Sequence, residues 1–338
     1  MARKPLLALY SLTHFWVDLS CAFLAFRFLS GSADFLLCLL LYNFCAFALQ
    51  MPLGLWADGL DRNGVVAAAG CGLTAAAFLV PVPLAAAVIA GVGNALFHLG
   101  GGIDVLNTSG KRAAALGVFV SPGAVGLYVG TFWGGGTAIS ALLPPIGLLI
   151  LGGGILVLCK RTMGSLRSGN APVETESVGG SWLPLIPLFL VVVLRSWMGL
   201  GQSFPWKTEW SLSLVAALAL GKAAGGYLMD AVGPRRAAGW SLGLAAVLYL
   251  FSGDPIPGIF AVFLFNMTMP MTLWAAAKIL PGAKGFGFGL LTFALFLGYL
   301  PVYLGWPSVF GSVWACTAAA ALSLTLLWRP LGKEALRC

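Results

Sequence analysis

Long apolar runs, separated by short polar stretches, follow one another along the whole chain. A helix needs about 20 apolar residues to cross the hydrocarbon core of a membrane, and most of these runs approach that length. The pattern therefore predicts twelve membrane-spanning helices with short loops, at 6–28, 35–57, 64–81, 83–106, 111–133, 139–159, 182–204, 208–230, 236–252, 257–280, 286–305 and 308–328. Ten or eleven spans stay an alternative, because glycine-rich stretches such as 134–136 would then end their helices differently.

One connection is much longer than the others. Residues 160–181 are rich in Ser, Gly, Glu and Arg and fall between the sixth and seventh predicted spans. This segment is interpreted as a cytoplasmic linker between two six-helix halves, 1–159 and 182–338. We therefore expect an all-α membrane protein with twelve transmembrane helices in two pseudo-symmetric six-helix bundles, since helices satisfy all of their backbone hydrogen bonds internally.

A short pattern occurs once in each half, at the junction of two apolar runs. Gly54 is followed by Asp58, and Gly226 is followed by Asp230, with arginines close behind in both copies. A small residue lets a helix approach its neighbour closely, and an aspartate can accept hydrogen bonds from the start of an adjacent helix, where the dipole favours an anion. The repeat indicates internal duplication and predicts a gate formed by Asp58, Arg62, Asp230, Arg235 and Arg236. A simple topology signal would fit the arginines but not the repeated glycine.

Composition and charge narrow the class of protein further. With 59% hydrophobic and 9% charged residues and a mean hydropathy of +0.94, the chain is not an ordinary globular domain. Most of the 19 Lys and Arg fall in the predicted cytoplasmic loops, linker and termini, and Arg27 and Lys207 lie on the opposite side. The positive-inside rule then predicts both termini in the cytoplasm, and we expect the protein in the plasma membrane. The net charge of +8 reflects this topology, so nucleic-acid binding is not expected.

Few polar side chains lie inside the predicted spans. A charge at the centre of a membrane helix costs roughly 2.5 to 3.5 kcal/mol, so such side chains usually face a cavity or a partner. Residues four apart share one face of a helix, and matched positions in spans one, four, seven and ten carry polar or aromatic side chains. The candidate substrate- and proton-binding residues are His14, Trp16, Asp18, Asn94, His98, Arg195, Trp197, Thr268 and Thr272.

Structural roles are open for several of these side chains. An intramembrane histidine can simply join two helices by hydrogen bonds, and Arg195 and Asp18 can act as a fixed latch. Lys222 can extend its side chain to the cytoplasmic interface, while Asp104 can cap a loop or act in the gate. The sequence does not decide between the roles of Lys222 and Asp104. The cysteines form no Cys-x-x-Cys pair, so neither a disulfide nor a metal site is predicted.

These features resemble the major facilitator superfamily, in which two six-helix halves are joined by a cytoplasmic linker and the loop motif after span two recurs after span eight. Four further motifs are similar to the fosmidomycin-resistance branch of exporters: His14-Phe15-x-x-Asp18, Ala95-Leu96-Phe97-His98, Arg195-Ser196-Trp197 and Leu280-Pro281-Gly282. The chain departs from the branch where Leu99 replaces the usual proline, and from the loop motif where Gly59 replaces an arginine. The run from Ser121 to Gly126 is similar to a degenerate antiporter motif, although packing alone can also explain it.

The residues and the resemblance together predict a secondary transporter for a small organic solute or drug. Arg195 with His14 or His98 favours an anionic solute, Asp18 is the expected proton carrier, and the resemblance implies export by alternating access of the two halves. The expected partners are the small-molecule substrate, protons and membrane lipids. We expect a monomer that needs no cofactor.

Other functions are weighed against this hypothesis. An enzyme is not expected, because the sequence lacks His-Glu-x-x-His and Gly-x-Ser-x-Gly. A non-transporting membrane sensor or assembly subunit stays an alternative, because a fold alone does not fix function. An uptake permease for a small organic anion is the alternative among transporters, since the sequence does not indicate a direction of transport.

Overall fold

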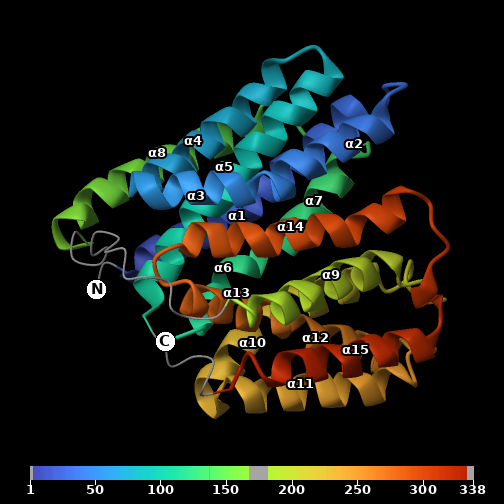
Figure 1. The fold of residues 1–338 in the computed structure, drawn as a ribbon. Helices are drawn as coiled ribbons and strands as arrows, with labels where there is room; N and C mark the ends of the chain where they lie inside the picture. Colours follow the sequence, from blue (N-terminus) through green and yellow to red (C-terminus); the bar gives the residue numbers. More distant parts are fainter. Residues whose placement is uncertain (1–2, 111, 137, 167–181, 333–338) are drawn as a thin grey trace. The chain divides into compact units, whose positions relative to one another are not determined.

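The computed structural model describes residues 3–110, 112–136, 138–166 and 182–332 (Figure 1). The described residues form helices and contain no β-strand. Of the predicted linker at 160–181, residues 167–181 lie outside the described residues. The chain divides into two compact units, and each is considered by itself.

The first unit comprises Met1–Gly110, Pro122–Glu176 and Gly282–Gly289. Its helical elements are α1 (Arg3–Leu24) with a π-helical continuation, Ala25–Leu29; α2 (Phe35–Asn43), a π-helical segment, Phe44–Ala48, and α3 (Gln50–Leu60); α4 (Asn63–Ala76) with a 3-10 turn, Ala77–Leu79; α5 (Pro83–Ser109); α7 (Pro122–Gly134); and α8 (Leu143–Leu166). Within this unit α4 packs along α5 and α8, and α1 packs along α7 (Figure 1).

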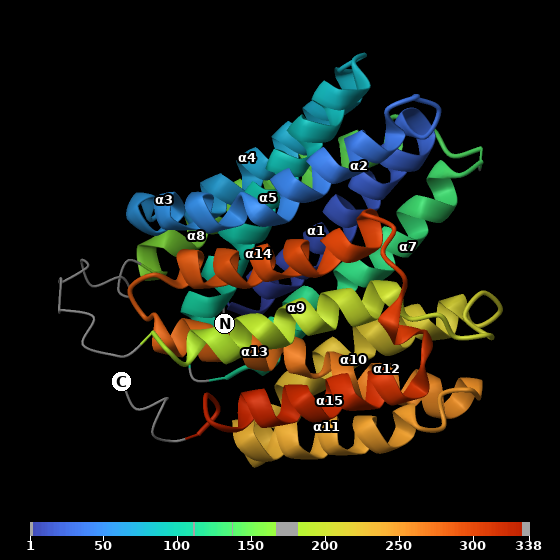
Figure 2. The same ribbon diagram turned by 45° about the vertical axis from the view of Figure 1, so that its right-hand side comes forward.

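The second unit comprises Lys111–Ser121, Ser177–Pro281 and Leu290–Cys338. Its helical elements are α6 (Ala114–Val120), α9 (Leu185–Gly201), α10 (Ser211–Val232), α11 (Pro234–Tyr249), α12 (Pro255–Asn266), α13 (Thr268–Ile279), most of α14 (Lys284–Tyr303), a 3-10 turn, Val309–Gly311, and α15 (Val313–Trp328). Here α11 lies beside α15 (Figure 2), and α10 packs against α6 and α12. Each unit thus includes one segment from the other side of the predicted linker, and the predicted boundaries at 159 and 182 stay a prediction.

Joined across their interruptions, the helices account for the twelve predicted spans. Eight of the joined helices are long and apolar enough to cross a membrane, and Asn63–Leu79, Leu185–Gly201 and Val313–Trp328 are shorter apolar helices. The predicted helical fold is confirmed. Proline explains two of the interruptions, because its missing N–H and its ring disrupt the preceding helical turn. Pro122 begins α7 directly after α6, and Pro270 lies four residues after the end of α12 at Asn266.

Two glycines of α7 allow the close packing of α1 that shapes the first unit. A Cβ atom on Gly126 would overlap the backbone oxygen of Phe15, and one on Gly130 would overlap that of Leu19. Close backbone approach through small residues is a common way to hold membrane helices together. It brings the His14–Asp18 turn of α1 directly against the start of α7.

Candidate functional site

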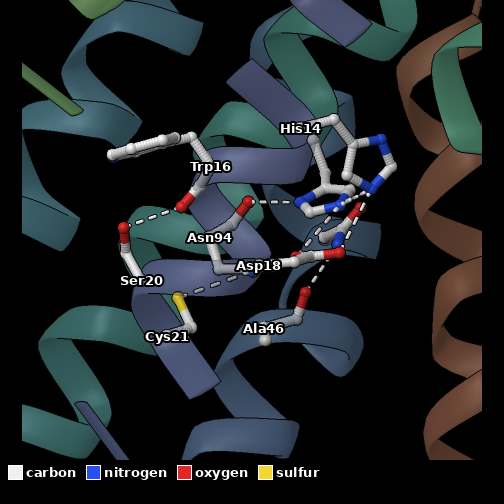
Figure 3. Close-up of polar contacts among 9 residues, drawn as sticks. His14, Trp16, Asp18, Ser20, Cys21, Ala46 and Asn94 are labelled. Carbon is white, nitrogen blue, oxygen red and sulfur yellow. Dashed lines mark hydrogen bonds and ion pairs between the residues drawn. The ribbon is translucent and has the colours of Figure 1, made fainter. Parts of the chain in front are cut away.

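Three ionisable side chains of the first unit converge between α1 and α5. His14 Nε2 lies 2.9 Å from His98 Nε2 and 3.3 Å from Asp18 Oδ2. His98 Nε2 lies 3.8 Å from Asp18 Oδ1. We call His14, Asp18 and His98 the triad. The two polar helix faces that the sequence predicts therefore meet in one cluster (Figure 3).

Asn94 holds two members of the triad in position. Its side-chain Nδ2 donates a hydrogen bond to Asp18 Oδ1 at 3.1 Å. Its backbone oxygen lies 2.9 Å from His98 Nδ1, and since a carbonyl oxygen can only accept, Nδ1 carries the hydrogen. In a neutral His98 ring the Nε2 atom that faces His14 and Asp18 is then a lone-pair acceptor.

The surroundings of the triad combine burial with limited exposure. His14 is buried, whereas the side chain of Asp18 is 21% exposed. The Phe97 ring meets the His14 ring edge-on, with centroids 6.1 Å apart. On the α7 side, a Cβ atom on Gly123 would overlap His14 Nε2 and Asp18 Oδ2. Glycine at this position therefore leaves room for the functional atoms of the triad.

Trp16 is turned away from the triad. Its indole Nε1 donates a hydrogen bond to the backbone oxygen of Pro144 at 2.9 Å, and a Cβ atom on Gly147 of α8 would overlap its ring. In Figure 3 its ring points away from His14 and Asp18. The structure thus uses Trp16 to join α1 to α8, and its predicted role in substrate binding stays a prediction.

In the second unit, Arg195 is a buried cation on α9. It is 7% exposed, and its Nη1 donates to Thr268 Oγ1 over 3.4 Å. The Thr268 hydroxyl in turn donates to the backbone oxygen of Phe265. Within the described part of the chain, no carboxylate lies within ion-pair distance of Arg195. Among the described residues, this long contact with Thr268 is the one hydrogen bond of the Arg195 guanidinium.

The two other candidate residues discussed in the second unit, Thr272 and Trp197, contact groups other than Arg195. The Thr272 hydroxyl donates to the backbone oxygen of Met269 at 3.0 Å. Trp197 packs edge-on against Phe310, with ring centroids 5.3 Å apart. Neither makes a hydrogen bond with Arg195 among the described residues. The structure therefore joins Arg195 to Thr268 and not to Thr272 or Trp197.

The first copy of the repeated motif closes on the start of α14, within the first unit. The Asp58 carboxylate accepts hydrogen bonds from the backbone N–H of Gly285 at 2.7 Å and of Phe286 at 2.9 Å. These donors belong to the first turn of α14, where backbone N–H groups have no partner inside the helix. A Cβ atom on Gly54 would overlap the backbone oxygen of Gly285. Glycine is therefore required for α3 to reach this contact.

The second copy repeats the same contact within the second unit. The Asp230 carboxylate accepts hydrogen bonds from the backbone N–H of Ala113 at 2.7 Å and of Ala114 at 3.0 Å, at the start of α6. A Cβ atom on Gly226 would overlap the backbone of Ala113 and Ala114. The two motif copies thus make equivalent helix-start contacts, although their role as a gate stays a prediction.

The arginines of the motif do not pair with these aspartates among the described residues. Arg62 and Arg236 are exposed. Arg235 donates from Nε to the backbone oxygen of Trp328 at 2.9 Å, and its guanidinium lies 5.3 Å from the centre of that ring. Arg235 therefore fastens the end of α15 to the start of α11.

The sequence did not identify a polar contact between α1 and α5. Tyr10 donates a hydrogen bond from its hydroxyl to Asp104 Oδ2 at 2.6 Å, which ties α1 to α5. Lys284 donates to Asn107 Oδ1 at 2.7 Å near the start of α14. An aspartate inside an apolar run signals a buried partner, but nothing in the sequence selects Tyr10 among the other tyrosines.

Lys207 of the second unit lies outside the predicted spans and has a shifted pKa. It lies in the connection between α9 and α10, and its Nζ donates to the backbone oxygen of Gln202 at 2.7 Å. Burial lowers the pKa of Lys207, because desolvation disfavours the charged form.

Comparisons with known proteins identify the fold. No protein-family model matches the sequence, and no curated protein matches it. A variant of the E. coli fucose:proton symporter FucP is similar in structure, with a TM-score of 0.66 at 13% identity over 97% of this chain and 99% of that one. The human organic anion transporter MFSD10 gives 0.65 at 14% identity over 97% and 99%. A bacterial homologue of the iron transporter ferroportin gives 0.61 at 16% identity over 96% and 97%.

These similarities span nearly the whole of each chain, while the identities are too low to indicate a shared substrate. The resemblance to the fosmidomycin-resistance branch stays a prediction. With the eight apolar helices of its described residues that are long enough to cross a membrane, and its full-length likeness to these structures, the chain is a multi-pass membrane protein with the major facilitator fold.

Proposed function

We propose that the protein is a secondary active transporter that moves a small organic anion by alternating access. The proposal is supported by the fold, which is shared with a fucose:proton symporter and an organic anion transporter. Coupling to protons and the direction of export are its finer parts. Proton coupling rests on the motifs of the sequence and on the symporter among the similar structures, whereas the direction of export rests on the motifs alone.

The proposal of an anionic solute rests on the surroundings of Arg195. A buried cation is costly inside a membrane protein unless an opposite charge or several hydrogen bonds compensate it. Among the described residues, Arg195 has one long hydrogen bond to a hydroxyl and no carboxylate within ion-pair distance. A carboxylate or phosphate on the solute would supply the missing charge through paired N–H···O bonds.

Thermal melting of the detergent-purified protein tests the anion preference. The probes are lactate, succinate and citrate, with neutral fucose for comparison, because a ligand that binds the folded state raises the melting temperature. We expect at least one anion to stabilise the wild-type protein. Arg195→Gln, which keeps hydrogen-bond donors but removes the charge, should lose that stabilisation.

Lys207→Gln is the matched control, since it removes a cation of the same unit from a connection outside the spans. It should respond to the anion as the wild type does. An Arg195→Gln protein that keeps the full anion response contradicts the assignment of Arg195. Stabilisation by fucose but by none of the anions contradicts the proposed class of solute.

A further inference from the structure

We propose that the triad of His14, Asp18 and His98 is a binding site for a divalent first-row transition-metal ion. The proposal goes beyond the proposed transport function, because it concerns a cation site in the first unit. It stands on the positions of the donor atoms, on the contacts that orient them and on the partial exposure of Asp18 and His98.

The spacing of the donor atoms suits one metal ion. One donor atom from each residue of the triad lies within 4.8 Å of the others, and the closest pairs are 2.9 and 3.3 Å apart. A metal that holds nitrogen and oxygen at about 2.1 Å spaces adjacent ligand atoms about 3.0 Å apart in octahedral and about 3.4 Å apart in tetrahedral geometry. The triad therefore needs little movement to place all three donors around one ion.

The groups behind the triad orient it as metal ligands are oriented elsewhere. A metal-bound histidine usually donates its other ring N–H to a backbone carbonyl or a carboxylate, which fixes the tautomer and aims the ligating nitrogen. His98 does this through Nδ1 and the Asn94 backbone oxygen at 2.9 Å, so its Nε2 lone pair faces the site. Asn94 also donates to Asp18 Oδ1 and holds the carboxylate in place.

The site is also partly open, and it has a polar atom that lacks a partner among the described residues. Gly123 stands where any side chain would overlap His14 Nε2 and Asp18 Oδ2. The side chains of Asp18 and His98 are 21% and 11% exposed, so the triad is not sealed. The side-chain oxygen of Asn94 is buried and accepts no hydrogen bond among the described residues. A water molecule on a bound metal ion can satisfy such an atom.

The donor types select the class of ion. Two imidazoles and one carboxylate suit Mn²⁺, Fe²⁺, Co²⁺, Ni²⁺ or Zn²⁺, whereas Ca²⁺ and Mg²⁺ prefer oxygen ligands. Three protein donors on one side leave further coordination positions for water or for an anion.

Metal binding can be measured without any assay of transport. Tag-free protein is purified in detergent, treated with a chelator and titrated with Mn²⁺ by calorimetry and with Co²⁺ by its visible absorption. The sequence contains 2 histidines, and both belong to the triad, so histidine-dependent binding reports on this site. We expect a single ion per chain, with Ca²⁺ binding far more weakly than Mn²⁺.

Variants locate the ion. His98→Ala and Asp18→Asn should each lower the affinity for Mn²⁺ at least about tenfold, as losses around metal sites do, and Gly123→Ala should also weaken binding. Asp104→Asn, a matched carboxylate change on α5 outside the triad, should leave the affinity unchanged. Where His98→Ala does not fold, His98→Gln replaces it.

Any of four results overturns the proposal. The first is that the wild-type protein binds neither Mn²⁺ nor Co²⁺, which would make the triad a hydrogen-bonded contact between helices. The second is that the triad variants bind with wild-type affinity. The third is that Asp104→Asn weakens binding as much as Asp18→Asn does. Equal affinity for Ca²⁺ and Mn²⁺ contradicts the chosen class of ion.

Discussion

At the scale of single residues, several polar side chains inside the helices serve to join one helix to another. Tyr10 and Asp104 illustrate this, because a buried hydroxyl on α1 donates to a partly buried carboxylate on α5 at 2.6 Å. Trp16 points the other way and binds the backbone of Pro144. Burial makes such contacts structural, since a buried polar atom that loses its partner is destabilising.

The Tyr10 contact leads to a prediction about stability. Tyr10→Phe should lower the free energy of unfolding by about 1 to 3 kcal/mol, because it leaves the partly buried Asp104 carboxylate without its hydroxyl donor. The measurement is the melting temperature in detergent. Tyr227→Phe is the control, since Tyr227 is 59% exposed. Equal melting temperatures for Tyr10→Phe and the wild type would show that the contact contributes nothing.

Much of the triad follows from the sequence, and the rest depends on tertiary contacts. His14 with Asp18, and Asn94 with His98, are four residues apart, which places each pair on one helix face. That the two faces meet at 2.9 Å depends on the approach of α1 and α5, which no local pattern encodes. The direction of Trp16, in contrast, follows from the helix period, because a residue two positions from both His14 and Asp18 lies on the opposite side of α1.

Among elements, glycines and aspartates at helix ends control how helices meet. Gly126 and Gly130 let α7 lie against the backbone of α1, and Gly54 and Gly226 do the same beside the two helix starts. The repeated motif predicts such contacts from its residue types. Its partners at Gly285 and Ala113 could not be chosen from the sequence, because helix periodicity does not specify which helices become neighbours.

The packing of α1 on α7 is testable with one methyl group. Gly126→Ala should destabilise the protein by about 1 to 3 kcal/mol, because the new Cβ overlaps the backbone oxygen of Phe15. Gly199→Ala is the matched control, since nothing lies within 4 Å of a Cβ there. It should be neutral or slightly stabilising. Thermal melting distinguishes the two, and equal melting temperatures would refute the close contact.

The gate hypothesis makes its own prediction at this scale. Asp58→Asn leaves one acceptor oxygen for the two N–H groups of Gly285 and Phe286, so one of the two hydrogen bonds should be lost. We expect slower solute exchange in proteoliposomes with nearly unchanged solute affinity in the melting assay. Unchanged turnover would reduce the motif to a topology signal. A large loss of affinity would instead place Asp58 in the solute site.

For the whole molecule, the helices establish the fold, whereas the proposed choice of solute rests on a few side chains. The helical spans were predictable because the membrane dictates the composition and length of the helices that cross it. The choice of solute was not, since many functions share one fold. The proposed transport function therefore depends on Arg195, the buried cation without a carboxylate partner among the described residues.

Solute flux in proteoliposomes tests that function most directly. The anion that stabilises the purified protein is loaded inside, and its release is followed with and without a pH gradient across the membrane. We expect release that depends on the protein, that is accelerated by the gradient and that is lost in Arg195→Gln but kept in Lys207→Gln. Release that is no faster than from protein-free liposomes, for an anion that the protein binds, would contradict the account.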